Sequence, residues 1–495
     1  MSHRHMDRLT SFDTSFLANE KANGHMAIGA VLVCEGEAPD PDDFLTHILS
    51  RVHQLPRLRQ RLLYPPLGLG TPFWVDHAEF DIHRHVRRVA LPAPGDEAQF
   101  RALVGELLAP PLDRSKPLWE LILVEGFAED RFAIVYKTHH AMADGISAVD
   151  IGMLLFDVEP RAEPDRDVAP WRPHRTPSRP ALIGRAGSGM LASLARLGRW
   201  LRRALRQPGR ARRRAADGIA GLWEVTWNLA RPAPATPWNT EIGSSRSFSW
   251  STFDLGEFKQ MKNALGGTVN DVTLAVAAGA LRRWLAERDV AVDGLELKAL
   301  VPVSIRTVDE HGELGNKLTA MRGPLPVGIA DPVERLRTVT AAMDALKSSK
   351  QPLGAEAIWG LNDWFRDFAP PVLLAPTAAI NFSTRLFNLL VTNFPGPQIP
   401  FYVLGRELVA IHPVGFLARR HALAIAILSY NGAVSFGLLA DPEALPGAER
   451  LNAHLAASVE ELRAAAQIAS PVDGDQLAGD DRPRFARDRE RLADA

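Results

Sequence analysis

The chain has a single cysteine, Cys34, among its 495 residues. One thiol cannot form a disulfide within the chain, which fits a protein of a reducing compartment. A lone cysteine can serve as a catalytic nucleophile, but Cys34 ends the apolar run Ile28–Cys34, which is typical of a buried strand. We therefore expect Cys34 to belong to the hydrophobic core.

Long apolar stretches and an excess of one charge sign are also missing. The longest apolar runs, such as Leu423–Leu428, have the length of a strand and not of a membrane span. The N-terminus lacks the apolar stretch of a signal peptide. The net charge of −1 gives no general attraction to nucleic acid. We expect a cytoplasmic protein that binds no nucleic acid and meets membranes only at their surface.

Hydrophobic residues make up 46% of the chain and charged residues 23%, as in globular proteins. Changes in composition divide the chain into four segments. Residues 1–158 alternate strand and helix patterns, and so do residues 246–469. Residues 159–245 form a basic, Pro- and Arg-rich linker between them. The charged tail 470–495 is expected to be disordered. The pattern predicts two α/β lobes with the functional site between them.

Local patterns within the first lobe are clear enough to predict individual elements. Ala27–Glu35 is expected to be a strand and Pro41–Gln54 a helix, with acidic residues in its first turn. Leu121–Phe127 and Phe132–Thr138 are expected to pair as a hairpin, because only a short polar turn separates them.

The strongest functional signal is the sequence Tyr136-Lys-Thr-His139-His140-Ala-Met-Ala-Asp144-Gly145. It follows the second hairpin strand and precedes a helical run, Ile146–Phe156. The end of a strand is a rigid platform from which the next loop can aim side chains into a cleft. Gly145 permits a backbone conformation that a β-branched residue would resist.

A histidine in such a loop suits general base catalysis, because its ordinary pKa lies near neutral pH. It can take the proton of an attacking alcohol and return it to a leaving thiolate, so no nucleophilic Ser or Cys is needed. Two alternatives remain open. The first is a metal site, although the spacing differs from the helical His-Glu-x-x-His pattern and no nearby Cys or Glu completes a ligand set. The second is a pair of buried core histidines.

Further motifs follow in order along the chain. They are Leu9–Leu17, Pro117-Leu118-Trp119, Asn270–Ala275 at the start of an apolar helix with Asn270 as its cap, Pro302–Arg306, Thr392–Pro397 and Leu428–Gly432. The histidine motif resembles that of the CoA-dependent acyltransferase superfamily. The ordered set is similar to the motifs of the bacterial wax ester synthase/diacylglycerol acyltransferase family, and the resemblance extends from about residue 7 to about residue 465.

The resemblance implies an α/β (α+β) fold of two chloramphenicol-acetyltransferase-like lobes with the active site in a channel between them. It implies that His139, His140 and Asp144 form the catalytic motif. His140 is then the base, and Asp144 orients the loop through an ion pair with an arginine. Asn270 and Asp271, with Gly145, are implied to bind the substrate or support the cleft.

The implied reaction is O-acyl transfer from acyl-CoA, a substrate and not a cofactor, to diacylglycerol or a long-chain alcohol. The products are triacylglycerol and wax ester. Two other functions remain open. One is a condensation or tailoring acyltransferase with a carrier-bound donor, although the chain contains no carrier domain. The other is a non-catalytic lipid-binding protein, and the intact His140 and Asp144 argue against it.

The linker contains a basic amphipathic segment. Residues 168–216 have no Asp or Glu but many Arg. On a helical wheel one face carries apolar side chains (Met190, Leu194, Leu197, Leu201 and Leu205), and the other carries arginines (Arg196, Arg199, Arg202, Arg203 and Arg206). Such a helix either packs its leucines on a lobe or lies in a membrane interface. We expect peripheral attachment to the inner face of the cell membrane or to lipid droplets.

Overall fold

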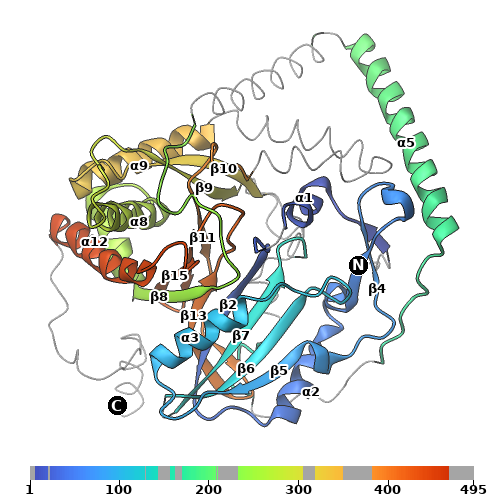
Figure 1. Cartoon of the computed structure of the whole chain (residues 1–495), viewed down its shortest axis with the longest axis horizontal. Coiled ribbons are helices and arrows are strands. Elements are labelled where there is room, and N and C mark those ends of the chain that lie inside the picture. The colour runs from blue at the N-terminus through green and yellow to red at the C-terminus, as the bar shows by residue number, and fades with distance from the viewer. Residues whose placement is uncertain are drawn as a thin grey trace.

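The computed structural model describes residues 6–20, 23–128, 130–142, 156–161, 170–207, 209, 232–304, 318–348 and 382–467. Two six-stranded sheets and a small three-stranded sheet, ordered β1-β4-β3, form the body of the molecule (Figure 1). The strands of the small sheet are β1 (Met6–Arg8), β3 (Gln60–Leu63) and β4 (Phe73–Asp76).

The first large sheet has the order β12-β13-β2-β7-β6-β5. The bounds of its strands are β2 (Ala27–Glu35), β5 (Val86–Ala90), β6 (Trp119–Phe127), β7 (Arg131–His139), β12 (Phe401–Val403) and β13 (Arg406–Val414). Helices α1 (Ser11–Asn19), α2 (Pro41–Val52) and α3 (Glu97–Leu108) belong to the same half of the chain.

The predicted elements of this half are confirmed. Strand β2 has the expected bounds, and α2 ends two residues earlier than expected, at Val52. Strands β6 and β7 form the expected antiparallel hairpin. Cys34 is fully buried, as predicted, and burial raises the pKa of its thiol far above the ordinary value, so it is a poor nucleophile.

The second large sheet has the order β10-β9-β11-β14-β15-β8. Its strands are β8 (Ser247–Asp254), β9 (Leu297–Ser304), β10 (Leu318–Leu325), β11 (Leu389–Pro395), β14 (Leu423–Tyr430) and β15 (Ala433–Ala440). Helices α7 (Leu255–Leu265), α8 (Val269–Ala286), α9 (Pro332–Ser348) and α12 (Leu451–Ala465) complete this half, and α8, α9 and α12 lie together beside the sheet in Figure 1. Helix α8 is buried along most of its length, because most of its side chains are apolar.

Strands from both halves of the chain pair in the first large sheet. The predicted boundaries at residues 158 and 246 gave no sign of this pairing. Strand β13 comes from the C-terminal half but pairs antiparallel with β2 of the N-terminal half. His412 of β13 is buried, stacks on Trp250 of β8 with ring centroids 4.6 Å apart, and meets the Ser435 hydroxyl of β15 at 2.8 Å. Strand β13 therefore joins the two large sheets, and the lobes do not coincide with sequence halves.

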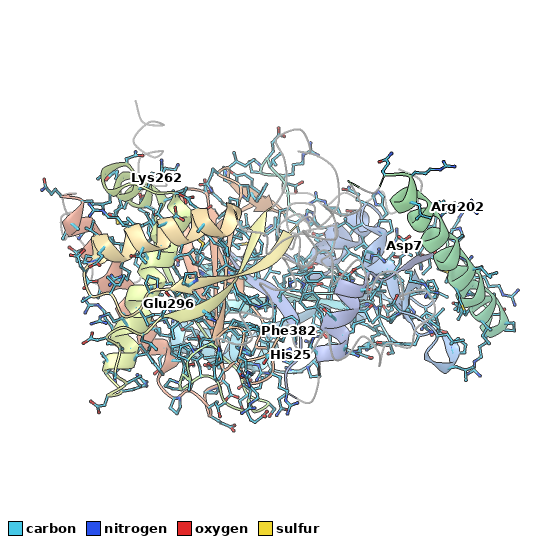
Figure 2. All side chains as sticks on the ribbon, turned by 90° about the horizontal axis from the view of Figure 1, so that it is seen from above. Asp7, His25, Arg202, Lys262, Glu296 and Phe382 are labelled. Carbon is cyan, nitrogen blue, oxygen red and sulfur yellow. The ribbon has the colours of Figure 1, made fainter. Side chains whose placement is uncertain are left out.

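The basic segment forms helix α5 (Arg179–Arg206), as predicted. Its first turn is attached to the body, because Leu182 is buried against Phe73 and Val75 of β4. The remainder extends along one end of the molecule, where Figure 2 labels Arg202. Within the described ranges no single helix has the length and apolarity of a membrane span, and only the sharply bent pair α7 and α8 passes that test together.

Candidate functional site

The paired histidines lie where β7 ends. The His139 N–H donates to the Leu118 carbonyl at 3.0 Å, and the His140 N–H donates to the Met26 carbonyl at 2.9 Å. The chain then turns, with the Met142 N–H donating to the His139 carbonyl at 2.8 Å. Backbone hydrogen bonds thus fix residues 139–142, which we call the histidine turn.

Aromatic side chains surround the His140 ring. The Phe16 ring of α1 stacks on it with centroids 3.9 Å apart, and the Phe416 ring meets it edge-on at 5.5 Å. Phe382 contacts both phenyl rings, and Figure 2 labels it in the middle of the molecule. These phenylalanines cover one face and one edge of the partly buried His140 ring and hold it in one plane.

This environment keeps His140 neutral. Burial, with a smaller contribution from the neighbouring His139, lowers the pKa of His140 to about 4 against the opposing effect of its own backbone. A neutral imidazole keeps a lone pair on one ring nitrogen, which is what a general base requires.

The His139 ring is held by a buried network that the sequence did not reveal. Its Nδ1 accepts the Ala141 N–H at 3.0 Å, so its proton is on Nε2, which faces Oε2 of Glu20 at 3.3 Å. Arg114 binds the same carboxylate through Nε at 2.9 Å and donates to the Leu17 carbonyl at 2.8 Å. His139 is only 1% exposed, so it holds the histidine turn and does not face a substrate.

The charges of this network are balanced. Burial alone would raise the pKa of Glu20, but hydrogen bonds from His139 and Arg114 and the positive charge of Arg114 outweigh it and lower that pKa to about 2. Glu20 is therefore an anion at neutral pH. It directly follows α1, the helix that also supplies Phe16, so one segment positions both histidines.

An apolar cavity of about 110 Å³ opens beside His140. Both halves of the chain line it. Its walls include Ile28, Ala30, Leu32, Tyr136 and His140 from the first half, and Leu390, Thr392, Phe401, Leu408 and Phe416 from the second. The cavity suits a hydrocarbon chain with its reacting end at His140.

Asn270 and Asp271 lie behind this cavity. Asn393 of β11, between the lining residues Thr392 and Phe394, donates from Nδ2 to Oδ1 of Asn270 at 3.1 Å. The predicted helix cap was wrong. Thr268 caps α8, and Asp271 completes a capping box by accepting the Thr268 N–H at 2.8 Å. Asn270 thus contacts the strand that carries two lining residues, Asp271 caps α8, and neither residue lines the cavity, so their predicted role stays a prediction.

The remaining predicted site residues, Asp144 and Gly145, and most of the predicted helix Ile146–Phe156 lie outside the described residues. The ion pair of Asp144 with an arginine therefore stays a prediction. Across the described parts of the chain, no three His, Cys, Asp or Glu side chains are grouped as metal ligands.

The fold matches solved structures of one architecture. A wax ester synthase/diacylglycerol acyltransferase from Marinobacter aquaeolei VT8 superposes with a TM-score of 0.63 at 25% identity, over 93% of this chain and 100% of that one. The starter condensation domain of rhizomide synthetase superposes with a TM-score of 0.53 at 14% identity, over 96% of this chain and 98% of that one. The chain thus has the predicted chloramphenicol-acetyltransferase-like fold of mixed α/β type.

Sequence comparison identifies the family to which this chain belongs among proteins of this fold. The model of the wax ester synthase/diacylglycerol acyltransferase catalytic domain matches residues 9–273, and that of the C-terminal domain matches residues 314–463. A probable diacylglycerol O-acyltransferase, tgs1, of Mycobacterium tuberculosis is 33% identical over 90% of this chain and 93% of its own. A second, tgs2, of the same organism is 32% identical over 94% of this chain and 100% of its own. The chain belongs to the wax ester synthase/diacylglycerol acyltransferase family, and it is an acyltransferase.

Proposed function

We propose that this chain transfers a long-chain acyl group from acyl-CoA to the hydroxyl of diacylglycerol or of a long-chain alcohol, with His140 as the general base. One observation carries the proposal. His140 lines an apolar cavity formed by both halves of the chain, and burial lowers its pKa to about 4, so its imidazole is neutral. A group in this state can accept the proton of an alcohol. Acyl-CoA is a substrate, and the reaction needs no cofactor.

The proposed reaction has two proton transfers. His140 takes the hydroxyl proton as the alcohol oxygen forms a bond to the thioester carbonyl carbon. The tetrahedral intermediate then collapses, the C–S bond breaks, and the imidazolium returns the proton to the departing CoA thiolate. Phe16 and Phe416 favour this sequence, because apolar rings against His140 limit the access of water that would hydrolyse the thioester.

Support for the acceptor class comes from the cavity and the relatives. A cavity lined almost entirely by apolar side chains binds hydrocarbon better than a sugar or an amino acid. The relatives above are named as diacylglycerol O-acyltransferases. Diacylglycerol is therefore the first acceptor to test, and a long-chain alcohol the second.

The function is tested by following thiol release from palmitoyl-CoA with dioleoylglycerol or hexadecanol as acceptor. We expect release that depends on the acceptor, with triacylglycerol or wax ester found by chromatography in equal amount. Release without ester would indicate hydrolysis. No release with either acceptor would favour a carrier-bound donor or a lipid-binding role.

The pH profile should reflect the lowered pKa of His140. The neutral ring is the active form, so activity is kept above the pKa and lost as the pH falls through about 4. We expect kcat/KM to change less than twofold between pH 7.5 and 5.5. A histidine with the ordinary pKa of about 6.5 would lose about tenfold over the same interval. Circular dichroism at each pH excludes unfolding as the cause, and a tenfold loss would contradict the assigned environment.

We also propose that α5 attaches the protein to the surface of a membrane or lipid droplet on the cytoplasmic side. Leu191 is 69% exposed and Leu205 is 82% exposed, so these two apolar side chains of α5 do not pack on the described body. Arg199, Arg202 and Arg206 are also exposed on this helix. Exposed leucines beside arginines fit an anionic lipid surface.

Replacing Leu191 and Leu205 together with glutamate should release the protein from lipid. We expect binding to phosphatidylglycerol-containing vesicles in flotation to fall about tenfold or more, because each leucine contributes about 1.5–3 kcal/mol of apolar burial. Leu67→Glu is the matched control, since Leu67 is 85% exposed outside α5. Equal flotation of the double variant and the control would exclude α5 as the attachment site.

A further inference from the structure

Residues from both large sheets line the apolar cavity beside His140. Strands β2 and β13 contribute to one wall, and β11 and β14 contribute to the other. Alternate side chains of a strand share one face of the sheet. Such alternate residues line the cavity from β2 (Ile28, Ala30 and Leu32) and from β11 (Leu390, Thr392 and Phe394). The cavity therefore runs along the strands.

The strand register gives the direction and the length of this cavity. His139 pairs with Ala27 at the start of β2. Leu408, which lines the cavity, pairs with Cys34 near the other end of β2. From Ala27 to Cys34 are seven residue steps (34 − 27), or about 24 Å of strand. His140 therefore lies at one end of the cavity and Leu408 at the other.

Buried aromatic side chains close the Leu408 end. Phe401 of β12 pairs with Leu408 and is 4% exposed, and Phe156 is 7% exposed; both line the cavity. The Tyr430 hydroxyl accepts the Phe401 N–H at 2.8 Å and donates to the Leu408 carbonyl at 2.9 Å, which holds these strands together. The residues that directly follow Phe156 and Phe401 exchange two backbone hydrogen bonds of 2.8 Å. Among the described residues, this end of the cavity is therefore a fixed wall.

Ala30 lies between the two ends. It pairs with Pro413 on one neighbouring strand and with Tyr136 on the other, and all three residues line the cavity. Strand β2 is central in its sheet, yet Ala30 remains partly exposed, as a side chain that faces open space does. Ala30 is three residue steps beyond Ala27, or about 10 Å along the strand.

These lengths correspond to definite hydrocarbon chains. An extended chain advances about 1.2 Å per covalent bond, so about 24 Å holds about twenty bonds and about 10 Å holds about eight. We propose that the cavity binds one substrate hydrocarbon chain, with its reacting end at His140 and its methyl end at Phe401 and Leu408, and that these two residues set the longest chain accepted. The inference rests on the proposed function and deepens it. Ala30 then leaves room for the chain beyond about its eighth bond.

Replacing Ala30 with leucine should shorten the accepted chain, because leucine adds three carbons that face the cavity. We expect the ratio of kcat/KM for palmitoyl-CoA to that for octanoyl-CoA, with dioleoylglycerol as acceptor, to fall about tenfold or more, since each CH₂ group that loses its contacts costs about fourfold. The ratio for hexadecanol to octanol, with octanoyl-CoA as donor, is measured beside it. A fall in the first ratio assigns the cavity to the acyl chain, and a fall in the second assigns it to the alcohol chain.

The matched control is Ala90→Leu, since Ala90 is exposed on β5 of the same sheet and does not line the cavity. This control should leave both ratios unchanged.

Replacing Phe401 with alanine should have the opposite effect. The hydrogen bonds at this end use the Phe401 backbone, so they remain after the ring is removed. In the series that Ala30→Leu affects, wild type should lose about tenfold or more in kcat/KM from palmitoyl-CoA to behenoyl-CoA, or from hexadecanol to docosanol. Phe401→Ala should recover at least about fivefold of that loss, because the longer chain then finds room for one or more CH₂ groups.

The outcomes are separable. Unchanged ratios in both series would overturn the inference, and so would equal losses at every chain length, which would indicate a defect of packing or of the reaction centre. If the variants do not fold, wild type decides by itself, since equal kcat/KM for the medium and the longest chains in both series contradicts a closed end. Failure of the proposed function appears differently, as wild type that releases no CoA with any pair of substrates.

Discussion

Replacement of His140 with alanine is expected to lower kcat for acceptor-dependent CoA release by about 10²–10⁴-fold. His140 lies on the cavity wall and is the proposed base, and alanine has no group that could take the hydroxyl proton. The KM for palmitoyl-CoA should change little, because the base acts on the acceptor in the transition state. Single-turnover measurement with saturating acceptor would separate this loss from slow product release.

The interpretation of that experiment depends on an intact fold. Alanine at 140 removes the ring that stacks on Phe16, so circular dichroism and the melting temperature should accompany the rates. His53→Ala is a matched control, since His53 is exposed beyond the end of α2. A folded His140→Ala protein with turnover near that of the control would show that another group is the base.

Replacement of Glu20 with alanine should have the second largest effect. It leaves the buried His139 N–H and the Arg114 guanidinium without their shared acceptor. We expect the free energy of unfolding to fall by about 2 kcal/mol, the value of a hydrogen bond to a charged group. We expect kcat to fall about tenfold to hundredfold, because the histidine turn loses its anchor and small displacements of a catalytic group are costly.

A purely structural role of Glu20 can be distinguished from a positioning role. In Glu20→Gln the amide oxygen can still accept a hydrogen bond from His139, so this variant should recover most of the melting temperature and part of kcat, with KM unchanged. Chemical denaturation measures the stability of each variant, and steady-state kinetics measure kcat and KM. If Glu20→Ala is less stable but keeps its kcat, the network does not position His140.

The sequence predicted elements whose pattern is local. The hairpin of β6 and β7 was evident because two apolar runs flank a short polar turn, and α5 because apolar residues recur at helical spacing. His139 and His140 were found because both belong to one contiguous motif. The structure brings them to the end of β7, where the pattern predicted them.

Contacts between distant segments could not be predicted in this way. Glu20 is a single acid with no periodic pattern, and its partners His139 and Arg114 lie far along the chain. The pairing of β13 with β2 is equally invisible, since any apolar strand could fill that edge. The cap of α8 was misplaced for a different reason. Thr268 and Asn270 are both good cap residues, and only the backbone geometry decides between them.

The pairing of β13 with β2 has a consequence for folding while the chain is being synthesised. The edge of β2 is completed by Arg406–Val414, which leaves the ribosome long after β2 itself. Until then, the N-terminal half has an open strand edge beside Cys34 and its apolar neighbours, and open edges invite pairing with other chains. Such distant contacts also slow folding. The nascent N-terminal half therefore completes its sheet only after β13 has been synthesised, and until then the edge of β2 is open to pairing with other chains.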